Sequence, residues 1–226
     1  MSSKRTRRKR RRKQTILLIL SMGALLVLVM IGMMRAAQLS KKGESGSGLF
    51  SGMFPTKKVG KLEVTEMYLT PNKYSRPQIK LRKIRGVVVH YTANPGASAE
   101  GNRNYFENLK ESKETYASSH FIIGLNGEVV QCIPLNEIAY ASNERNSDTI
   151  SIECCHPGRN GKFNQKTYDS LVKLTAWLCG RYNLKKRNII RHYDVTGKMC
   201  PKYYVEHEDK WNQFKNDVFQ YIQDNT

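Results

Sequence analysis

Negative charge is scarce in this sequence, and it is absent before Glu44, the first acidic residue. The 226 residues carry 38 Lys and Arg against 19 Asp and Glu, so the formal net charge is +19. Nine of these positive charges lie between Lys4 and Lys13, which leaves about +10 on the rest of the chain. A chain this basic favours an anionic partner: nucleic acid, a membrane face or an anionic wall polymer.

The chain also lacks an internal repeat, and it lacks the stacking platform and base-reading motif of nucleic-acid-binding proteins. The first absence excludes a repeat architecture, and the second leaves charge as the only argument for nucleic acid. No nucleic-acid partner is therefore expected. With 226 residues and 39% apolar side chains, the chain can build one domain of ordinary size and an additional segment.

Charge is missing altogether from Ile16–Met34, where most residues are Leu, Ile, Val or Met. As a helix, a run of ~19 residues spans roughly 28 Å, close to the thickness of a bilayer core. The basic arm of residues 1–15 precedes this run, and dense positive charge stays on the cytoplasmic side. The alternative is a cleaved signal peptide, because Ala36 and Ala37 permit cleavage, but its apolar region is normally only ~7–15 residues.

Residues 35–61 are rich in Ser, Gly and Lys, a composition typical of a flexible linker. The sequence thus predicts a cytoplasmic arm, a single transmembrane helix at residues 16–34, this linker and a folded domain at residues 62–226. The folded domain is expected outside the cell, held at the membrane, or secreted if the apolar run is removed.

Strands and helices alternate in the folded part. Apolar and β-branched runs predict strands at Ile84–Tyr91, Ser119–Leu125, Glu128–Ile133, Thr149–Cys155 and Asn188–His192. Helical spacing predicts helices at Ala97–Leu109, capped by Ser98, and at Asn164–Tyr182 and Trp211–Ile222. Asn126-Gly127 predicts a tight hairpin. Together these elements predict an α/β fold with a mixed central β-sheet flanked by helices.

Three potential metal ligands lie at the ends of predicted strands or in the loops after them. His90 ends the first strand, His192 ends the last, and Cys200 follows in a loop before Pro201. Two imidazoles and a thiolate suit zinc and leave a fourth position open for water. Because these residues are far apart in sequence, their spacing alone is weak evidence, and a lone histidine at a strand end is more often structural.

Several motifs in order resemble the zinc-dependent N-acetylmuramoyl-L-alanine amidase family, which includes T7-type phage lysozyme, endolysins and peptidoglycan recognition proteins. The resemblance extends from about Val64 to Ile222. It is carried by VVVHYTANPGAS at Val87–Ser98, SSHFIIGLNGEVVQCIP at Ser118–Pro134, TISIECC at Thr149–Cys155 and RHYDVTGKMCP at Arg191–Pro201.

The resemblance implies one Zn²⁺ per domain, bound by His90, His192 and Cys200. It implies hydrolysis of the amide between N-acetylmuramic acid and L-alanine, with peptidoglycan as partner. It also marks Glu153 as the carboxylate that assists the zinc-bound water, and Lys198 as a cation that stabilises the oxyanion. A nearby carboxylate can accept a proton from water and return it to the departing amine.

His120 is expected near the metal, either supporting a ligand from behind or lining the groove, because three ligands are already accounted for. Asp194 is expected to orient a ligand imidazole. The sequence departs from the family in two places. Ser119 stands where some relatives have a catalytic tyrosine. Its absence makes Glu153 the main candidate for the catalytic role. The stretch AYAS at Ala139–Ser142 replaces the AWHA of many relatives, which puts details of the substrate groove in doubt.

The alternative function is a non-catalytic module that binds muropeptides without cutting them. Such relatives typically lack the cysteine ligand, so the presence of Cys200 favours catalysis. The other four cysteines are compatible with disulfides outside the cell or with small core residues: Cys132, Cys154, Cys155 and Cys179. The physiological role, the preference for one stem peptide and the oligomeric state do not follow from the sequence.

Overall fold

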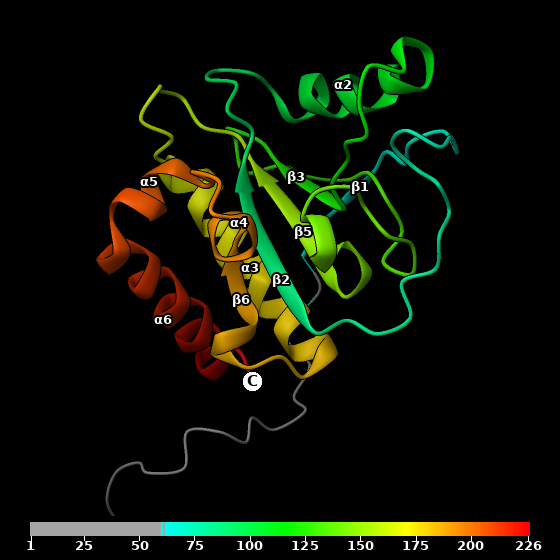
Figure 1. The fold of residues 1–226 in the computed structure, drawn as a ribbon. Helices are drawn as coiled ribbons and strands as arrows, with labels where there is room; N and C mark the ends of the chain where they lie inside the picture. The colour runs from blue at the N-terminus through cyan, green and yellow to red at the C-terminus, as the bar shows by residue number, and fades with distance from the viewer. Residues whose placement is uncertain (1–59, 61) are drawn as a thin grey trace, which may run out of the picture. The chain divides into compact units, whose positions relative to one another are not determined.

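The computed structural model describes Gly60 and residues 62–226 (Figure 1). The predicted basic arm, the predicted transmembrane helix and nearly all of the predicted linker lie outside this part. Within it, no helix is long and apolar enough to cross a bilayer.

Six strands form one sheet in the order β1-β4-β3-β5-β2-β6. All neighbouring strands are parallel except β3 and β4, which form the antiparallel hairpin predicted around Asn126-Gly127. The mixed sheet is therefore confirmed. Its strands are β1 (Thr65–Glu66), β2 (Gly86–Tyr91), β3 (Phe121–Ile123), β4 (Val129–Gln131), β5 (Thr149–Cys154) and β6 (Ile189–Arg191).

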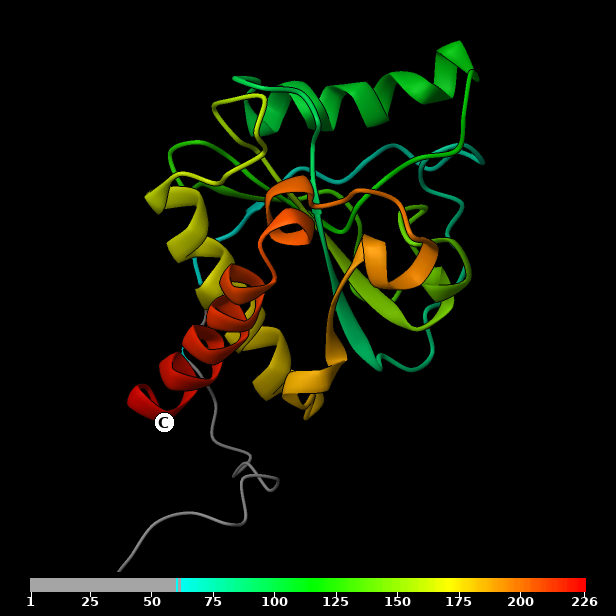
Figure 2. The ribbon, with the colours of Figure 1, turned by 60° about the vertical axis from the view of Figure 1, so that its left-hand side comes forward.

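Helices flank this sheet, as predicted. Figures 1 and 2 show α3 and α6 packed together on one side and α2 apart from them. The α-helices are α2 (Ala99–Ser112), α3 (Gln165–Tyr182), α4 (His192–Thr196), α5 (Lys202–Glu206) and α6 (Glu208–Asp224), and the 3-10 turns are η1 (Asn143–Ser147) and η2 (Lys186–Asn188). The predicted cap of α2 is confirmed, because the Ser98 hydroxyl accepts a hydrogen bond from the Gly101 N–H at 3.0 Å.

Successive side chains of a strand face opposite sides of the sheet, as the period of two in a strand requires. Val87 and Val89 of β2 and Ile152 of β5 lie in the core that α3 and α6 cover. Ile122 of β3 lies in the second core, together with Phe106 and Leu109 of α2. Residues of β2 and β5 that point away from the α3/α6 core are therefore free to build a site.

The cysteines outside the predicted ligand set are buried core residues. Cys154 and Cys179 lie in the core beneath α3 and α6, and Cys132 and Cys155 lie in the core beneath α2. All five cysteines are free thiols. Of the two possibilities that the sequence left open, the structure therefore has the small core side chains.

The largest differences from the predicted elements lie near the carboxyl end of the sheet. His192 does not end a strand, because β6 stops at Arg191 and His192 is the first residue of α4. The sequence also gave no signal for the short helices α4 and α5. At five residues each, both are too short to show a helical period.

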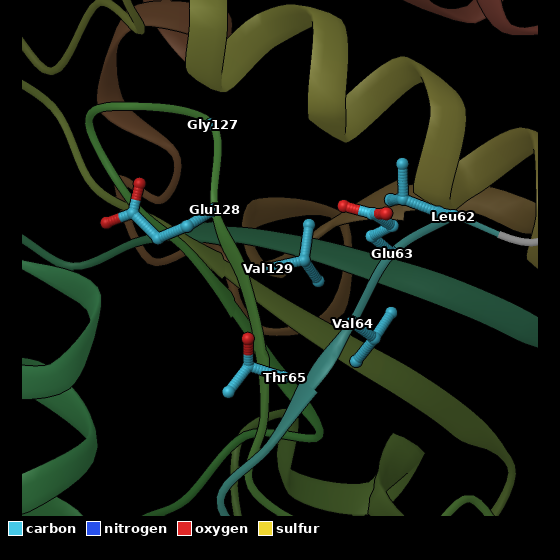
Figure 3. Close-up of a pocket in the computed structure, with 7 residues that line it drawn as sticks. All are labelled: Leu62, Glu63, Val64, Thr65, Gly127, Glu128 and Val129. Atoms are coloured by element: carbon cyan, nitrogen blue, oxygen red, sulfur yellow. The ribbon is translucent and has the colours of Figure 1, made fainter.

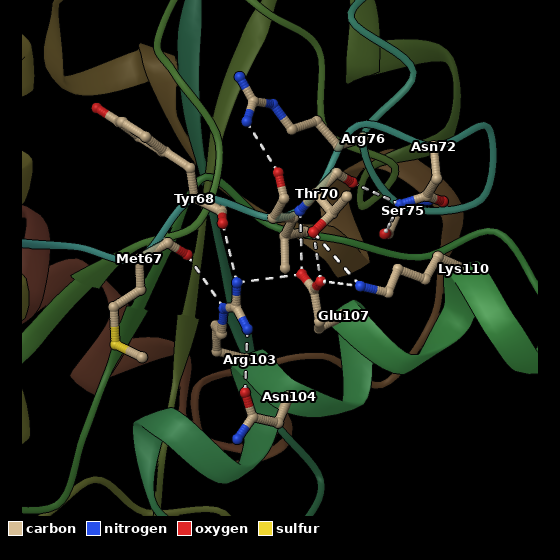
Figure 4. Close-up of polar contacts among 11 residues, drawn as sticks. Met67, Tyr68, Thr70, Asn72, Ser75, Arg76, Arg103, Asn104, Glu107 and Lys110 are labelled. Atoms are coloured by element: carbon tan, nitrogen blue, oxygen red, sulfur yellow. Dashed lines mark hydrogen bonds and ion pairs between the residues drawn. The ribbon is translucent and has the colours of Figure 1, made fainter.

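A polar clamp fastens the segment that follows β1 onto α2 (Figure 4). The Arg103 guanidinium donates to the carbonyl oxygens of Met67 and Tyr68 at 3.1 and 2.9 Å. The Glu107 carboxylate accepts from the Thr70 N–H at 3.0 Å and from the Thr70 hydroxyl at 2.6 Å. Arg103 and Glu107 also pair with each other at 3.1 Å, so one turn of α2 binds Met67, Tyr68 and Thr70 of the incoming chain.

Glu107 generates a pH-dependent prediction. Burial acts to raise its pKa, but the hydrogen bonds from Lys110 and Thr70 and the charge of Arg103 outweigh it and lower the pKa to about 2. A carboxyl group whose pKa is lower in the folded state than in the unfolded chain stabilises the fold. This contribution is complete at pH values well above the unfolded pKa, near 4.5, and it is lost as the pH falls toward 2. Glu107→Gln should therefore lower the free energy of unfolding by about 1–2 kcal/mol at pH 7, after solvent screening.

Urea unfolding of the full chain at pH 7 and pH 3 measures this difference. The difference in the free energy of unfolding between wild type and Glu107→Gln should become smaller as the pH falls. A gap that is the same at both pH values would assign the loss to packing and contradict the electrostatic account. Glu111→Gln on the same helix is the matched control, because Glu111 is exposed.

Candidate functional site

The site begins with two side chains on neighbouring strands. His90 of β2 and Glu153 of β5 are register partners in the parallel ladder. Both alternate with residues of the α3/α6 core, such as Val89 and Ile152, so they point to the opposite face. The pairing of β2 with β5 thus places an imidazole and a carboxylate side by side near the carboxyl ends of the strands.

The other two potential ligands come from the segment after β6. His192 opens α4, and the chain then turns through Gly197, whose φ of 76° falls in the left-handed region. The Tyr193 N–H donates to the Cys200 carbonyl at 2.9 Å, which closes the segment on itself. This closure brings the Cys200 thiol back beside His192.

His90, His192 and Cys200 form a compact cluster whose ligand atoms all lie within 4.8 Å of one another. The Cys200 Sγ lies 3.8 Å from the His90 Nδ1, and the two imidazole rings are 4.7 Å apart at their centroids. A nitrogen and a sulfur bound tetrahedrally to one zinc would lie roughly 3.5 Å apart. The three donors therefore fit a zinc ion without a large rearrangement.

Ser142 holds His90 from the other side of the ring, and the sequence gave no signal for this contact. The His90 Nε2 lies 3.2 Å from the Ser142 Oγ, which in turn lies 3.3 Å from the Ser151 Oγ. All three groups are buried. A neutral imidazole with its proton on Nε2 donates to Ser142 and leaves Nδ1, the atom that faces Cys200, free to bind a metal.

The electrostatics of the cluster also suit a cation. Burial, His192 and Lys198 lower the pKa of His90, and burial and Lys198 lower that of His192, so both rings stay neutral. Burial, followed by the charge of Glu153, raises the pKa of the Cys200 thiol to about 12. A thiolate at this position therefore needs a nearby positive charge, which a divalent metal supplies.

Glu153 lies at the edge of the cluster with unused hydrogen-bonding capacity. Its Oε1 is 3.9 Å from the His90 Nδ1, and 17% of its side chain is exposed. Its Oε2 is buried and has no hydrogen-bond partner among the described residues. Burial raises the pKa of Glu153 to about 8, and the charge of Lys198 opposes this rise. A carboxyl group in such surroundings can exchange a proton near neutral pH.

A cleft of ≈ 290 Å³ opens onto the cluster. Tyr105 and Phe106 of α2 line it, and so does Tyr140 from the segment before η1. His90, Glu153, His192, Lys198 and Cys200 line the same cleft. Lys198 is exposed, so its ammonium group can approach a bound molecule.

A larger cavity of ≈ 690 Å³ lies elsewhere, between the chain around β1 and the start of β4 (Figure 3). Its lining contains the carboxylates of Glu63 and Glu128, which Figure 3 shows on either side of Val129. It contains no histidine, cysteine or basic side chain among the described residues. Volume therefore does not identify the functional site here, whereas the clustered donors do.

Two residues that the sequence placed near the metal have other partners. The His120 Nδ1 accepts from the Ser151 N–H and its Nε2 lies 3.0 Å from the Glu137 carbonyl, so main-chain groups occupy both ring nitrogens. His120 is also absent from the lining of the cleft. Burial, which outweighs the contact with Glu137, lowers the pKa of His120 to about 4. His120 therefore does not line the groove; it binds the main chain of Ser151, whose hydroxyl contacts Ser142.

Asp194 does not reach a ligand imidazole either. Its carboxylate accepts from the Arg191 main-chain N–H at 2.8 Å and from the Arg191 guanidinium at 2.7 Å. Arg191 also donates to the Tyr204 carbonyl and to Glu208, which joins the end of β6 to α4, α5 and α6. Asp194 and Arg191 thus hold the loop that carries the ligands, while Ser142 binds the imidazole.

Comparisons with known proteins agree with this geometry. The family model described as N-acetylmuramoyl-L-alanine amidase matches residues 80–203, a stretch that includes all three potential ligands and Glu153. The amidase CwlL of Bacillus licheniformis is 34% identical over 170 residues, covering 70% of this chain and 47% of CwlL. The amidase BlyA of Bacillus subtilis (strain 168) is 35% identical over 175 residues, covering 68% of this chain and 46% of BlyA.

The chain spans about half the length of these curated relatives. Among solved structures, the catalytic domain of XlyA superposes with a TM-score of 0.59 at 26% identity, covering 70% of this chain and 99% of that domain. The structure of PlyL superposes with a TM-score of 0.60 at 26% identity, covering 70% of this chain and 97% of PlyL. This chain therefore belongs to the N-acetylmuramoyl-L-alanine amidase family.

Proposed function

We propose that this protein is a zinc-dependent cell-wall hydrolase that cleaves the amide between N-acetylmuramic acid and the L-alanine of the peptidoglycan stem peptide. One observation carries the proposal: His90, His192 and Cys200 converge at the floor of a cleft that also contains Glu153. Membership of the amidase family supplies the substrate class, and the names of CwlL and BlyA agree with it.

His90 through Nδ1, His192 through its imidazole and Cys200 through Sγ are the residues that would hold the zinc. When bound, zinc polarises the scissile carbonyl and lowers the pKa of a water toward ~7. Ser142 fixes the His90 ring so that Nδ1 faces the other two ligands. The loop between His192 and Cys200 keeps its shape through the Tyr193–Cys200 hydrogen bond and through Arg191.

Glu153 moves the proton in this proposal. Its carboxylate lies beside His90, and it has a buried oxygen without a hydrogen-bond partner among the described residues. It accepts the proton of the attacking water and delivers it to the stem-peptide nitrogen, because that nitrogen would otherwise have to leave as a strongly basic amide anion. Such acid–base assistance is worth roughly 10²- to 10⁴-fold in rate.

Lys198 contributes charge rather than proton transfer. It lines the cleft, and it acts electrostatically on His90, His192 and Glu153. A cation here offsets the negative charge that develops on the carbonyl oxygen in the transition state. Because a bound zinc would carry most of that stabilisation, Lys198 would contribute less to the rate than Glu153.

The walls of the cleft suit a glycopeptide. Tyr105, with 48% of its surface exposed, and Phe106 offer apolar faces from α2, and Tyr140 offers another from the segment before η1. Aromatic faces with a polar edge can contact a sugar ring or a peptide side chain. Tyr140 stands in the AYAS stretch that departs from the AWHA of many relatives, so this wall should differ from theirs.

The alternative is a recognition module that binds muropeptides without cutting them. Such a module needs the cleft but not a complete ligand set or a proton-transfer group. This chain retains Cys200 in the cluster and Glu153 beside it. The combination favours catalysis over simple binding.

We further propose that Ile16–Met34 anchors the protein in the membrane, with the residues after it outside the cell. The apolar run and the preceding basic arm support this proposal. Protease added to intact protoplasts should digest the amidase domain and leave the anchored arm. A protected domain would contradict the orientation, and a shortened soluble product would indicate signal cleavage instead.

The metal proposal makes a prediction about Ser142. His90→Ala should abolish stoichiometric zinc binding, because it removes one of the three ligands. Ser142→Ala should keep the fold and bind zinc about tenfold more weakly, since the imidazole loses the partner that orients it. Competition with a chromophoric chelator measures this affinity without any activity assay.

Ser142→Thr should restore the affinity, because it returns a hydroxyl, and Ser147→Ala removes an exposed serine from the neighbouring 3-10 turn as a matched control. An unchanged affinity in Ser142→Ala would show that the hydroxyl does not orient His90. A wild-type chain that binds no zinc would instead overturn the metal proposal.

The acid–base proposal predicts a separable loss. Glu153→Gln should bind zinc and remain folded, but its kcat on purified muropeptides should fall roughly 10²- to 10⁴-fold because the proton shuttle is gone. Lys198→Ala should lower kcat by a smaller factor. Mass spectrometry of digested peptidoglycan identifies the bond that wild type cuts, and near-wild-type turnover by zinc-loaded Glu153→Gln would rule out Glu153 as the shuttle.

A further inference from the structure

Two exposed segments at the amino ends of neighbouring strands concentrate positive charge. One precedes β2 and the other leads into β6. We call their six exposed basic residues the basic pole: Arg82, Lys83, Arg85, Lys185, Lys186 and Arg187.

The sheet forces the two segments together. Val87 of β2 is the register partner of Ile189 of β6, so the residues just before each strand are neighbours. A Cβ on Gly86 would lie only 2.9 Å from the Asn188 carbonyl oxygen, which shows how closely the two chains approach. Figures 1 and 2 show both segments at the end of β2 opposite its arrowhead.

Acidic side chains of the described domain do not neutralise the basic pole. None of its six residues takes part in an ion pair within the part of the chain that the structure describes. Asp148, whose carbonyl accepts from the Arg85 N–H, is already paired through its carboxylate with Arg145 at 2.7 Å. Lys186 contacts only the neutral Asn216 amide. Like charges crowded in this way are stabilised by an external anion.

The basic pole is separate from the catalytic cleft. None of its residues lines the cleft, and His90 lies near the carboxyl end of β2, whereas the pole lies at the amino end. At about 3.3 Å per residue, the strand holds them roughly 13 Å apart or more. A ligand on the pole would therefore leave the cleft open.

We propose that the basic pole docks on an anionic lipid bilayer through its headgroup phosphates. Charge complementarity is one argument, because each Lys or Arg close to an anionic bilayer strengthens attachment by about fivefold. Length is the other. If Ile16–Met34 is anchored as proposed, residues 35–61 would join the anchor to the domain, and a chain of this Ser-, Gly- and Lys-rich composition would span roughly 30 Å. Such a tether keeps the pole within reach of the headgroups and favours a bilayer over a diffusing polymer.

Docking of this kind would also fix the orientation of the domain relative to the bilayer. With the amino ends of β2 and β6 on the bilayer, the carboxyl ends of the strands and the cleft face away from it. Substrate would then reach the cleft from the wall side. The proposal concerns attachment and does not depend on the chemistry of the cleft.

Lysine acetylation of the full chain in nanodiscs tests this docking. The acetylation rates of Lys83, Lys185 and Lys186, read by peptide mass spectrometry, should fall by about fivefold or more when phosphatidylglycerol is added to phosphatidylcholine. High salt should reverse the effect, because it screens the attraction. Lys166 and Lys173 on α3, both exposed, serve as internal controls and should keep their rates.

Charge reversal at arginine leaves the lysine reporters intact. Arg82→Glu/Arg187→Glu should lose the protection, whereas Lys166→Glu/Lys173→Glu, which changes the net charge by the same amount, should retain it. Equal rates in both lipids would overturn the proposal. If both charge-reversal variants lost the protection from acetylation equally, the proposal would also be overturned, because net charge alone would then explain the binding. Protection that appears only on addition of poly(glycerol phosphate) would assign the pole to a wall polymer instead.

Discussion

The parallel pairing of β2 with β5 is the constraint on which the rest of the site depends. It aligns His90 with Glu153 and turns both away from the core beneath α3 and α6. A slip of one residue would turn one of the two side chains into that core, because neighbouring positions in a strand face opposite ways. The buried valines and isoleucines of the two strands oppose such a slip, so packing on one face fixes the chemistry on the other.

The second half of the cluster depends on a different kind of support. His192 and Cys200 belong to short helices and turns, which side-chain periodicity does not hold in place. Arg191 supplies the support, since it is 7% exposed and binds Asp194, Glu208 and the Tyr204 carbonyl. A rigid strand pair therefore faces a loop that one buried guanidinium fixes, and the metal would join the two.

The sequence predicted what periodicity and local turn chemistry encode. The hairpin at Asn126-Gly127, the cap at Ser98 and the alternating faces of β2 all follow from such patterns. Family resemblance, and not spacing, singled out the ligands. The partners of His120 and of the His90 ring were not predictable, because they are long-range contacts without a periodic signal. Ser142, for example, lies 52 residues from His90 in the chain. The contact of Asp194 with Arg191 is local, but it belongs to the start of α4, a helix too short to show a helical period.

The clamp between α2 and the segment after β1 has a mechanical consequence. Any pull on the chain before β1 would act first on β1, an edge strand with two register pairs to β4. The load then meets Arg103 and Glu107, which grip Met67 to Thr70. Strands β4, β3 and β5 separate β1 from β2. A pull from the amino-terminal side would thus separate β1 from β4 first, and the clamp would resist the load before it reached the strands around His90.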